Sequence, residues 1–548
     1  MATLRALLGP GTRRAEILLW VLALGVGAVL RLAFLLDETP HFDEWHPLLA
    51  VKRQGVEKLA TTFGVADRSI PVALYLELLS RSSGLTDFAA RAPFVAIGLA
   101  SLVLLPWALV RRGRHASLLR PVFALLLALS PLLVYYSRTI RPYGATTLLA
   151  VLAIAALERH RRSGGRRLWL ALAVAASAAT AWLLPVHFPF CFAALSAAWL
   201  QTRWRRGGRE ARPYLVAAAV ALALALLPLV PALARDAAAL VDKAGTASWR
   251  PFALSRAPAL LCGTRSVALG WIWLATAALF CARAAKRGDA NRQLLAAGAL
   301  GQVVALALIR PFGLHDPIIL GRYLLPLAPV GWVCVLDGAR TLGGRRRAAR
   351  GAPWQPMLLL ALAALLFWTG PLRGWLGPGP DNFASMRLHL RFVAGDEAAA
   401  VERPTPAVYA LLRHEPPGST AVLEVPYTGY VAEPYAFYQR DHRQVVFVGV
   451  TTGFCSPPRT IELPPDGERG FRLRRILALG DLDRLRRAGV RHVFLHRDSR
   501  QVAGGVELTN AFWDYQRCVD AFSALLGAAP VEDERTARFD LDPPVRTP

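Results

Sequence analysis

The sequence predicts a polytopic α-helical membrane protein of about eleven transmembrane helices, followed by a C-terminal extracytoplasmic α/β domain. Of the 548 residues, 54% are hydrophobic, more than an ordinary soluble domain carries. Apolar runs of roughly 18 residues or more recur over the first 375 positions, and each can cross a bilayer as a helix. Beyond residue 376 the apolar runs become short and strand-like.

The predicted membrane domain comprises residues 1–376, and its apolar segments are the candidate spans. They lie approximately at 15–36, 88–110, 121–137, 144–157, 168–185, 186–200, 214–233, 265–282, 293–309, 322–337 and 356–376. The first follows Arg5, Arg13 and Arg14. It is too long for a signal peptide and no small-residue cleavage site follows it, so we expect an uncleaved first helix.

The net charge of +26 is spread over short basic clusters between the apolar segments. The clusters are Arg111, Arg112 and Arg114; Arg159, Arg161, Arg162, Arg166 and Arg167; Arg203, Arg205, Arg206 and Arg209; Arg283, Lys286 and Arg287; and Arg345, Arg346, Arg347 and Arg350. Arginine-rich loops stay on the cytoplasmic side, so the pattern indicates topology and no nucleic-acid partner is expected. The N-terminus is then cytoplasmic, and an odd number of spans in the inner or plasma membrane places everything after residue 376 outside.

This topology assigns four loops to the external side. They are residues 37–87, 138–143, 234–264 and 310–321. The first loop is long, and its segment Leu48–Phe63 is amphipathic at helical spacing. That pattern is typical of a helix lying on the membrane surface.

Residues 377–548 form the predicted C-terminal domain, after a linker at residues 378–381 (Pro-Gly-Pro-Asp). The segments that indicate strands and helices are Thr420–Val425, Gln444–Val450, Leu479–Gly489, His492–His496 and Thr509–Leu526. Their mixture predicts a small α/β domain. Outside the cell Cys455 and Cys518 can form a disulfide, and the sequence leaves open whether they do.

Two carboxylates lie just after the first apolar segment, in the sequence His41-Phe42-Asp43-Glu44-Trp45-His46. A carboxylate near the membrane surface is partly desolvated, which raises its basicity. Asp43 and Glu44 are therefore candidates for general-base chemistry on a hydroxyl. The alternative is one helix cap and one solvated acid. A divalent metal held with His41 and His46 is a further alternative, although the spacing matches no recognised ligand pattern.

A second candidate group lies in Ser137-Arg138-Thr139-Ile140-Arg141-Pro142-Tyr143-Gly144, between two apolar segments. A charge at such a place is unfavourable unless it faces a cavity, a partner or a headgroup. The planar donor fork of a guanidinium matches a phosphate. Arg138 and Arg141, together with the hydroxyl of Tyr143, are therefore candidates for phosphate binding, and the alternative is an anchor at the membrane interface.

A third arginine lies at the start of a later apolar segment on the same predicted side. Arg322 begins the sequence Arg-Tyr-Leu-Leu-Pro, and His315 and Asp316 lie just before it. Arg322 can hold a phosphate or pair with an acid.

In order, spacing and sidedness, three short motifs resemble those of the GT-C glycosyltransferases. They are Phe42-Asp43-Glu44 after the first predicted helix, Ser137-Arg-Thr-Ile-Arg-Pro-Tyr143 after the third, and Arg322-Tyr-Leu-Leu-Pro326. The branch that the chain resembles contains the protein O-mannosyltransferases and the lipid A aminoarabinose transferases. The resemblance covers roughly residues 15–340.

The resemblance implies hexosyl or pentosyl transfer from a polyprenyl-phosphate-linked sugar on the outer face of the cytoplasmic membrane. It implies that Asp43 is the catalytic base and that the arginines of the second motif engage the donor phosphate. The acceptor, whether glycan, lipid or protein, stays open. Because the lipid phosphate already serves as leaving group, no cofactor is obligatory, and a divalent metal remains an alternative.

Two functions of other classes compete with this interpretation. A transporter or flippase of a lipid-linked substrate also needs external arginines, but transporters usually show paired repeats and polar residues within their helices. Neither is clear in this sequence. A non-catalytic envelope scaffold is the other alternative, and it predicts that Asp43 can be changed without loss of function.

Overall fold

The computed structural model of the chain divides into two compact units. One is made of Met1–Ala33, Arg53–Tyr75 and Arg91–Gly370, and the other of Phe34–Lys52, Leu76–Ala90 and Pro371–Pro548. The residues that the structure describes are 10–33, 35, 44, 47, 50–51, 54–63, 69–82, 87–110, 116–241, 251–311, 314, 317–342, 354–372, 405–425, 438, 442–447, 486, 489–497, 501–503, 506–508 and 515–541.

The described part of the chain up to residue 372 is helical, with two short 3₁₀ turns (η) and connecting turns. Its elements are α2 (Pro10–Leu32), α4 (Val56–Thr61), α5 (Ile70–Ser82), α6 (Asp87–Leu109), α7 (Ala116–Ala128), α8 (Pro131–Arg138), α9 (Tyr143–Arg162), α10 (Arg167–Leu183), η1 (Pro185–His187), α11 (Phe188–Arg206), α12 (Gly208–Leu226), η2 (Leu227–Leu229), α13 (Val230–Val241), α14 (Pro251–Cys262), α15 (Val267–Lys286), α16 (Ala290–Ile309), α17 (Pro317–Tyr323), α18 (Leu327–Leu342) and α20 (Trp354–Thr369). Each apolar segment expected from the sequence coincides with one or two of these helices.

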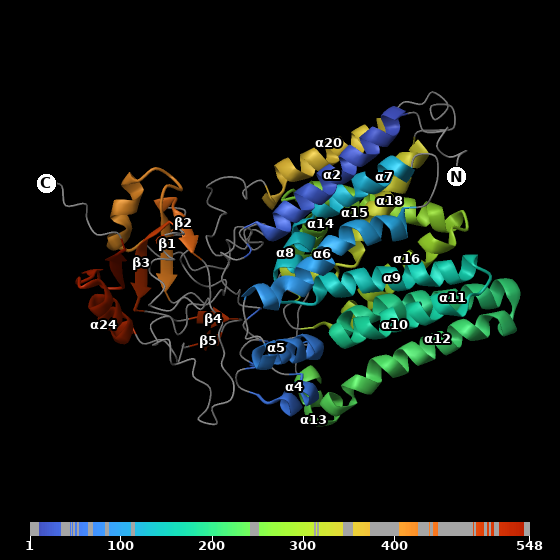
Figure 1. The fold of residues 1–548 in the computed structure, drawn as a ribbon, viewed down its shortest axis with the longest axis horizontal. Helices are drawn as coiled ribbons and strands as arrows, with labels where there is room; N and C mark the ends of the chain where they lie inside the picture. Colours follow the sequence, from blue (N-terminus) through green and yellow to red (C-terminus); the bar gives the residue numbers. More distant parts are fainter. Residues whose placement is uncertain are drawn as a thin grey trace. The chain divides into compact units, whose positions relative to one another are not determined.

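The helices pack along their lengths. α2 lies on α7, α9 on α10, and α11 on both α12 and α16. Figure 1 shows α9, α10, α11 and α12 running alongside one another. Large apolar side chains such as Leu168, Leu227 and Leu308 remain exposed on the outer faces. Exposed apolar side chains on long helices are what the hydrocarbon of a bilayer solvates.

Five described helices are long and apolar enough to span a membrane, and the count rises to seven if each of two bent pairs is one span. The five are Arg13–Leu32, Phe88–Leu109, Gly208–Ala238, Val267–Lys286 and Ala290–Ile309. These helices support a multi-pass membrane protein. The count of eleven spans stays a prediction, as does the boundary at residue 376.

Two apolar segments are broken by sharp bends. The chain bends by 65° between α7 and α8 and by 74° between α17 and α18. Pro131 is the first residue of α8, and Pro326 comes directly before α18. A proline donates no backbone hydrogen bond and disfavours helical backbone in the residue before it, so one helix ends and the next begins in a new direction.

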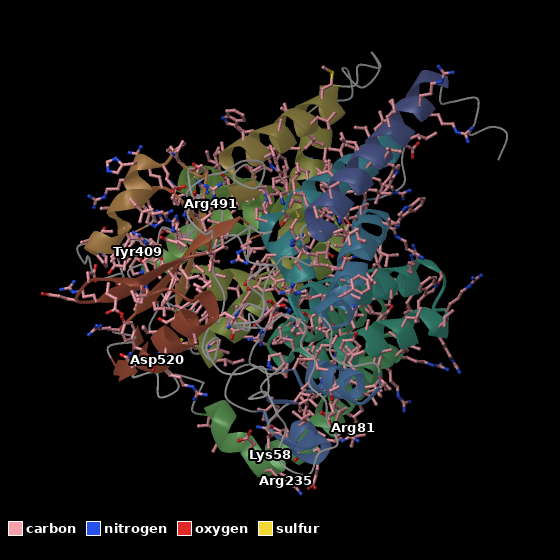
Figure 2. The ribbon with its side chains drawn as sticks, turned by 60° about the vertical axis from the view of Figure 1, so that its left-hand side comes forward. Lys58, Arg81, Arg235, Tyr409, Arg491 and Asp520 are labelled. Atoms are coloured by element: carbon pink, nitrogen blue, oxygen red, sulfur yellow. The ribbon has the colours of Figure 1, made fainter. Side chains whose placement is uncertain are left out.

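Two of the predicted external loops meet in the structure. α4, from the loop 37–87, packs on α13, and Arg235 of α13 donates a hydrogen bond of 2.8 Å to Glu57 of α4 (Figure 2). The backbone N–H of Phe63 donates to Asp236 at 2.8 Å. These contacts require both loops to lie at the same end of the helices, as the predicted topology does.

The described C-terminal residues form a five-stranded mixed sheet and a separate two-stranded one. The elements are η5 (Ala407–His414), β1 (Ala421–Val425), β2 (Val445–Phe447), β3 (Val490–His496), β4 (Gln501–Ala503), β5 (Val506–Leu508), α24 (Tyr515–Leu526), β6 (Val531–Glu532) and β7 (Thr536–Asp540). The larger sheet has the order β2-β1-β3-β7-β6. β1 is parallel to β2 and β3, whereas β7 is antiparallel to β3 and β6.

Alternate residues of β1 and β3 face two different cores. Leu423 pairs with Val493, and both pack with Phe522 of α24. The neighbouring Phe494 instead stacks on Tyr409 of η5, with ring centres 4.0 Å apart (Figure 2). This alternation follows from the two-residue period of a strand and explains why these strands are apolar on both faces.

Cys518 of α24 lies in the core beneath the sheet and is disulfide-bonded. Its partner expected from the sequence, Cys455, lies outside the described residues. The described cysteines of the helical part, Cys191, Cys262, Cys281 and Cys334, are free thiols.

Candidate functional site

The second arginine motif forms a tight joint between α8 and α9. α8 ends at Arg138, and the backbone N–H of Arg141 donates to the carbonyl of Thr139 at 2.7 Å. Pro142 then precedes α9, where the fixed backbone of proline suits the start of a helix. Arg138 and Arg141 are both only 3% exposed. They are therefore buried groups and not anchors projecting into headgroups.

Arg138 ties the end of α2 to this joint. Its Nη1 donates to the carbonyl oxygens of Leu30 and Ala33, each at 2.9 Å. The last carbonyls of a helix have no partner within the helix and carry partial negative charge, so a guanidinium stabilises them. Arg138 thus holds the C-terminal end of α2 at the joint.

A second buried arginine approaches the joint from α2 itself. Arg31 is 1% exposed, and its Nε donates to the hydroxyl of Ser137 at 3.2 Å. This contact needs Gly98 on α6, because a Cβ there would lie 2.2 Å from the Ser137 hydroxyl and 3.1 Å from Arg31 Nε. The glycine allows α6 to approach the polar contact closely.

The motif that contains Arg322 reaches the same joint from α17. The guanidinium carbon of Arg322 lies 5.3 Å from the ring centre of Tyr143 and 5.2 Å from that of Tyr323. The two tyrosine rings are themselves 6.4 Å apart. Stacking on aromatic faces holds a guanidinium plane while its N–H groups point in-plane, toward an acceptor. Two of the sequence motifs, far apart along the chain, therefore form one cluster.

A buried histidine connects this cluster to η1, the 3₁₀ turn between α10 and α11. His187 is fully buried, with Nε2 3.2 Å from the carbonyl oxygen of Arg322 and Nδ1 2.8 Å from the hydroxyl of Thr146. A carbonyl only accepts, so Nε2 carries the proton and Nδ1 accepts from Thr146. Nε2 thus holds the backbone of Arg322, and Nδ1 connects the ring to α9.

Gln302 of α16 completes the connection. Its Nε2 donates to the carbonyls of Val186 in η1 and Tyr323 in α17, each at 2.9 Å. Broken helices leave backbone carbonyls that must find partners away from water. The side-chain amide of Gln302 satisfies one backbone carbonyl in η1 and one at the end of α17.

The predicted site residues are described to different extents. Arg138, Arg141, Tyr143 and Arg322 all lie at this joint and are buried. Glu44 is 1% exposed and belongs to the other unit. Asp43, His41 and His46, like His315 and Asp316, lie outside the described residues, so their predicted roles stay predictions.

Several residues of the cluster were not expected from the sequence. Arg31 had a usable signal, since it is a charge within the first apolar segment. Tyr323 belongs to the motif that begins at Arg322, whereas His187 and Gln302 had no signal, because their roles depend on partners far away in the chain.

The described residues contain no group of three or more His, Cys, Asp or Glu side chains that could hold a metal. His41 and His46 lie outside the described residues. The alternative of a metal at His41 and His46 therefore stays a prediction.

Comparisons with known proteins give structural matches only. No family model matches the sequence, and no curated protein matches it. An oligosaccharyltransferase from Archaeoglobus fulgidus aligns with a TM-score of 0.35 and 13% identity, over 87% of this chain and 67% of the other. The arabinosyltransferase EmbB from Mycobacterium smegmatis aligns with a TM-score of 0.37 and 17% identity, over 58% of this chain and 30% of the other. Both names describe enzymes that transfer sugars.

Proposed function

We propose that the chain is an integral membrane glycosyltransferase that moves a sugar from a polyprenyl-phosphate donor to an envelope acceptor with inversion. The acceptor is a glycolipid, a polysaccharide or a protein. The observation that carries the proposal is the stacking of Arg322 on Tyr143 and Tyr323 at the joint that also holds Arg138 and Arg141.

The arginines suit the phosphate end of the reaction. When the bond from the anomeric carbon to the phosphate oxygen breaks, the phosphate leaves with the electron pair and gains negative charge. Guanidinium groups held in place before the reaction stabilise that charge without reorganising. Arg141 and Arg322 fill this role, and Arg138 joins them while also anchoring α2.

The acidic motif suits the acceptor end. The acceptor oxygen attacks the anomeric carbon from the side opposite the phosphate, and Asp43 takes its proton. Glu44 orients Asp43 or the acceptor. The carbonyl of Ala33, ten residues before Asp43 in the sequence, accepts a hydrogen bond from Arg138.

The sidedness of the reaction is also proposed. Disulfides persist in oxidising compartments, so the disulfide-bonded Cys518 supports an extracytoplasmic C-terminal domain. With a cytoplasmic N-terminus and an odd number of spans, the joint at residues 138–143 and Arg322 then faces the same outer side.

The test is sugar transfer in membranes from a radiolabelled polyprenyl-phosphate sugar. Asp43→Asn should lower turnover by about 100-fold or more, the range of a lost general base. Asp520→Asn is the matched control, because Asp520 is an exposed carboxylate on α24 (Figure 2), and it should retain wild-type turnover.

Protein abundance in the membranes is measured beside turnover, so that a folding defect is recognised. If Asp43→Asn transfers sugar at the wild-type rate, Asp43 is not the catalytic base, and the result favours a non-catalytic scaffold. If wild-type membranes move the labelled lipid across the bilayer without transferring its sugar, the flippase interpretation replaces this proposal.

A further inference from the structure

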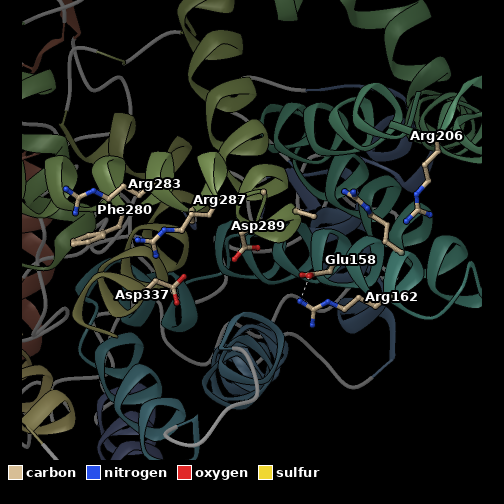
Figure 3. Close-up of a pocket in the computed structure, with 12 residues that line it drawn as sticks. Glu158, Arg162, Arg206, Phe280, Arg283, Arg287, Asp289 and Asp337 are labelled. Carbon is tan, nitrogen blue, oxygen red and sulfur yellow. Dashed lines mark ion pairs between the residues drawn. The ribbon is translucent and has the colours of Figure 1, made fainter. Parts of the chain in front are cut away.

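A second concentration of arginines lies at the other ends of the same helices. Its cavity has a volume of about 690 Å³. The lining residues are Glu158, Arg161, Arg162, Arg206, Phe280, Arg283, Ala284, Arg287, Gly288, Asp289, Ala290 and Asp337 (Figure 3). They come from α9, α11, α15, α16 and α18 and belong to one unit. Positive-inside topology explains why such arginines lie on one side, but not why three separate clusters line one hollow.

The shape of the cavity depends on a tight turn. α15 ends at Lys286 and α16 begins at Ala290. Between them Gly288 has a φ of +75°, a backbone conformation that side-chain-bearing residues rarely adopt. The turn brings the basic last turn of α15 and the first turn of α16 to the same hollow.

The acids of the cavity are engaged by neighbouring groups. Glu158 forms an ion pair with Arg162, and Asp337 lies 2.6 Å from Nε of Arg292, which does not line the cavity. Asp289 caps α16 by accepting from the backbone N–H groups of Asn291 and Arg292 at 3.1 and 3.3 Å.

Three of the five arginines form no ion pair among the described residues. Arg161 donates to the amide oxygen of Gln201 at 2.9 Å. Arg283 stacks on Phe280, with 5.6 Å between its guanidinium carbon and the ring centre. Arg287 is exposed and forms no ion pair within the described part of the chain. The cavity therefore carries uncompensated positive charge with forked donors.

From this geometry we infer that the cavity binds a phosphate group, and specifically the headgroup of an anionic membrane lipid. Basic pockets between transmembrane helices on the cytoplasmic side suit phosphorylated headgroups. Guanidinium forks match phosphate oxygens, and the exposed apolar flanks of the helices accommodate the acyl chains. The cavity is separate from the donor joint: Tyr143 and Glu158 are both on α9, about 22 Å apart at 1.5 Å per residue.

The experiment uses the full chain in detergent micelles and native mass spectrometry. The probes are phosphatidylglycerol, phosphatidylcholine and inorganic pyrophosphate. We expect retained phosphatidylglycerol on the wild-type protein, and at least about tenfold weaker retention in the variant Arg161→Gln, Arg283→Gln, Arg287→Gln, since each basic residue near a membrane contributes measurably to anionic-lipid binding.

The matched control is Arg205→Gln, Arg209→Gln, Arg212→Gln, which removes the same charge from exposed arginines that do not line the cavity. It should retain the lipid as the wild type does. The single change Arg287→Gln, at an exposed side chain, gives an intermediate loss and guards against misfolding of the triple variant.

The outcomes separate the sources of phosphate. Retention of phosphatidylglycerol but not phosphatidylcholine, lost only in the cavity variants, supports the lipid headgroup. Retention of pyrophosphate alone, with the same dependence on the cavity arginines, supports the phosphate site but overturns the lipid. The inference is overturned if the cavity variant and the control lose the lipid equally, or if the wild type retains neither anion. The positive-inside rule would then be the remaining explanation for the arginines.

Discussion

The two arginine groups of the membrane part use the same side chain in opposite surroundings. At the joint, Arg31, Arg138, Arg141 and Arg322 are 1%, 3%, 3% and 8% exposed. At the cavity, Arg283 and Arg287 are exposed. Buried guanidinium groups must be held by carbonyls, hydroxyls or rings, whereas exposed ones are solvated and available to a ligand from outside.

The difference shows that a cluster of arginines in the sequence does not by itself indicate whether those arginines hold the fold together or bind a ligand. Both groups occur at the ends of apolar segments, and both contain closely spaced arginines. Only the partners separate them: backbone carbonyls and tyrosine rings at the joint, and few described partners at the cavity. Changes at the joint should therefore affect activity and folding, and changes at the cavity should affect ligand retention.

The largest effect is expected at Arg322. Arg322→Lys keeps the charge but removes the planar fork that lies against the rings of Tyr143 and Tyr323. Sugar transfer should fall by about 100-fold, the effect of losing one preorganised donor to a developing anion. Transfer by Arg205→Lys, the same change at an exposed site, is measured alongside and should equal the wild type. Equal rates for both variants would remove Arg322 from the site.

Arg138 gives the next effect, on stability. Arg138→Met removes the donor to the carbonyls of Leu30 and Ala33. A buried acceptor left unsatisfied destabilises by about 1–3 kcal/mol, so a clear drop in the thermal unfolding midpoint is expected. Arg287→Met, at an exposed position, should stay within about 0.5 kcal/mol of the wild type. A comparable drop in both would erase the contrast between the two groups.

A comparable effect is expected at Gly98. A Cβ at this position meets Ser137 and Arg31, so Gly98→Ala should destabilise the fold by about 1–3 kcal/mol through overpacking. Gly25, on α2, has nothing within 4 Å of its would-be Cβ, and Gly25→Ala should be neutral or slightly stabilising. Unfolding midpoints of the two variants in one detergent test the difference; identical midpoints would contradict the close approach.

The smallest effect lies in the C-terminal sheet, whose polar contacts can titrate, unlike the guanidinium contacts of the joint. Nδ1 of His492 lies 2.7 Å from Asp540, and this hydrogen bond, opposed by burial and aided by the charge of Arg538, holds the pKa of Asp540 below its ordinary 3.8. A lowered carboxyl pKa stabilises the fold above that ordinary value and the contribution is lost as pH falls through the lowered one.

Asp540→Asn should therefore lower the unfolding midpoint near neutral pH by the equivalent of less than about 1 kcal/mol, as for other partly exposed pairs. As pH falls through the lowered pKa of Asp540, the wild type and the variant should converge. Asp520→Asn, at an exposed carboxylate of α24, should have the unfolding midpoint of the wild type at every pH. If the unfolding midpoint of Asp540→Asn stays below that of the wild type at low pH, Asp540 stabilises the sheet through packing and not through its charge.

Periodicity and apolar length located the helices of the predicted apolar segments and three of the strands. β1 and β2 lie within the segments expected from the sequence, β3 begins two residues before its expected segment, and α24 overlaps the last helical pattern. The bends were not foreseen, although Pro131 and Pro326 mark them in the sequence. α14, within the predicted external loop 234–264, was also not expected.

The site could be predicted as a set of residues but not as an arrangement. The local motif at residues 138–143 and Arg322 carried enough chemistry to be selected. That Arg322 stacks on Tyr143, and that Arg138 holds α2, depends on packing between distant segments, which no local pattern encodes. Asp43 rests on the sequence alone.

Gln302 has a consequence for the order in which the protein is made. It donates to Val186, synthesised 116 residues earlier, and to Tyr323, synthesised 21 residues later. At about 5–20 residues per second, the ribosome takes roughly 6 to 23 s between Val186 and Gln302. During this interval the carbonyl of Val186 needs another hydrogen-bond partner, such as water. The arginine joint cannot form until Tyr323 has left the exit tunnel.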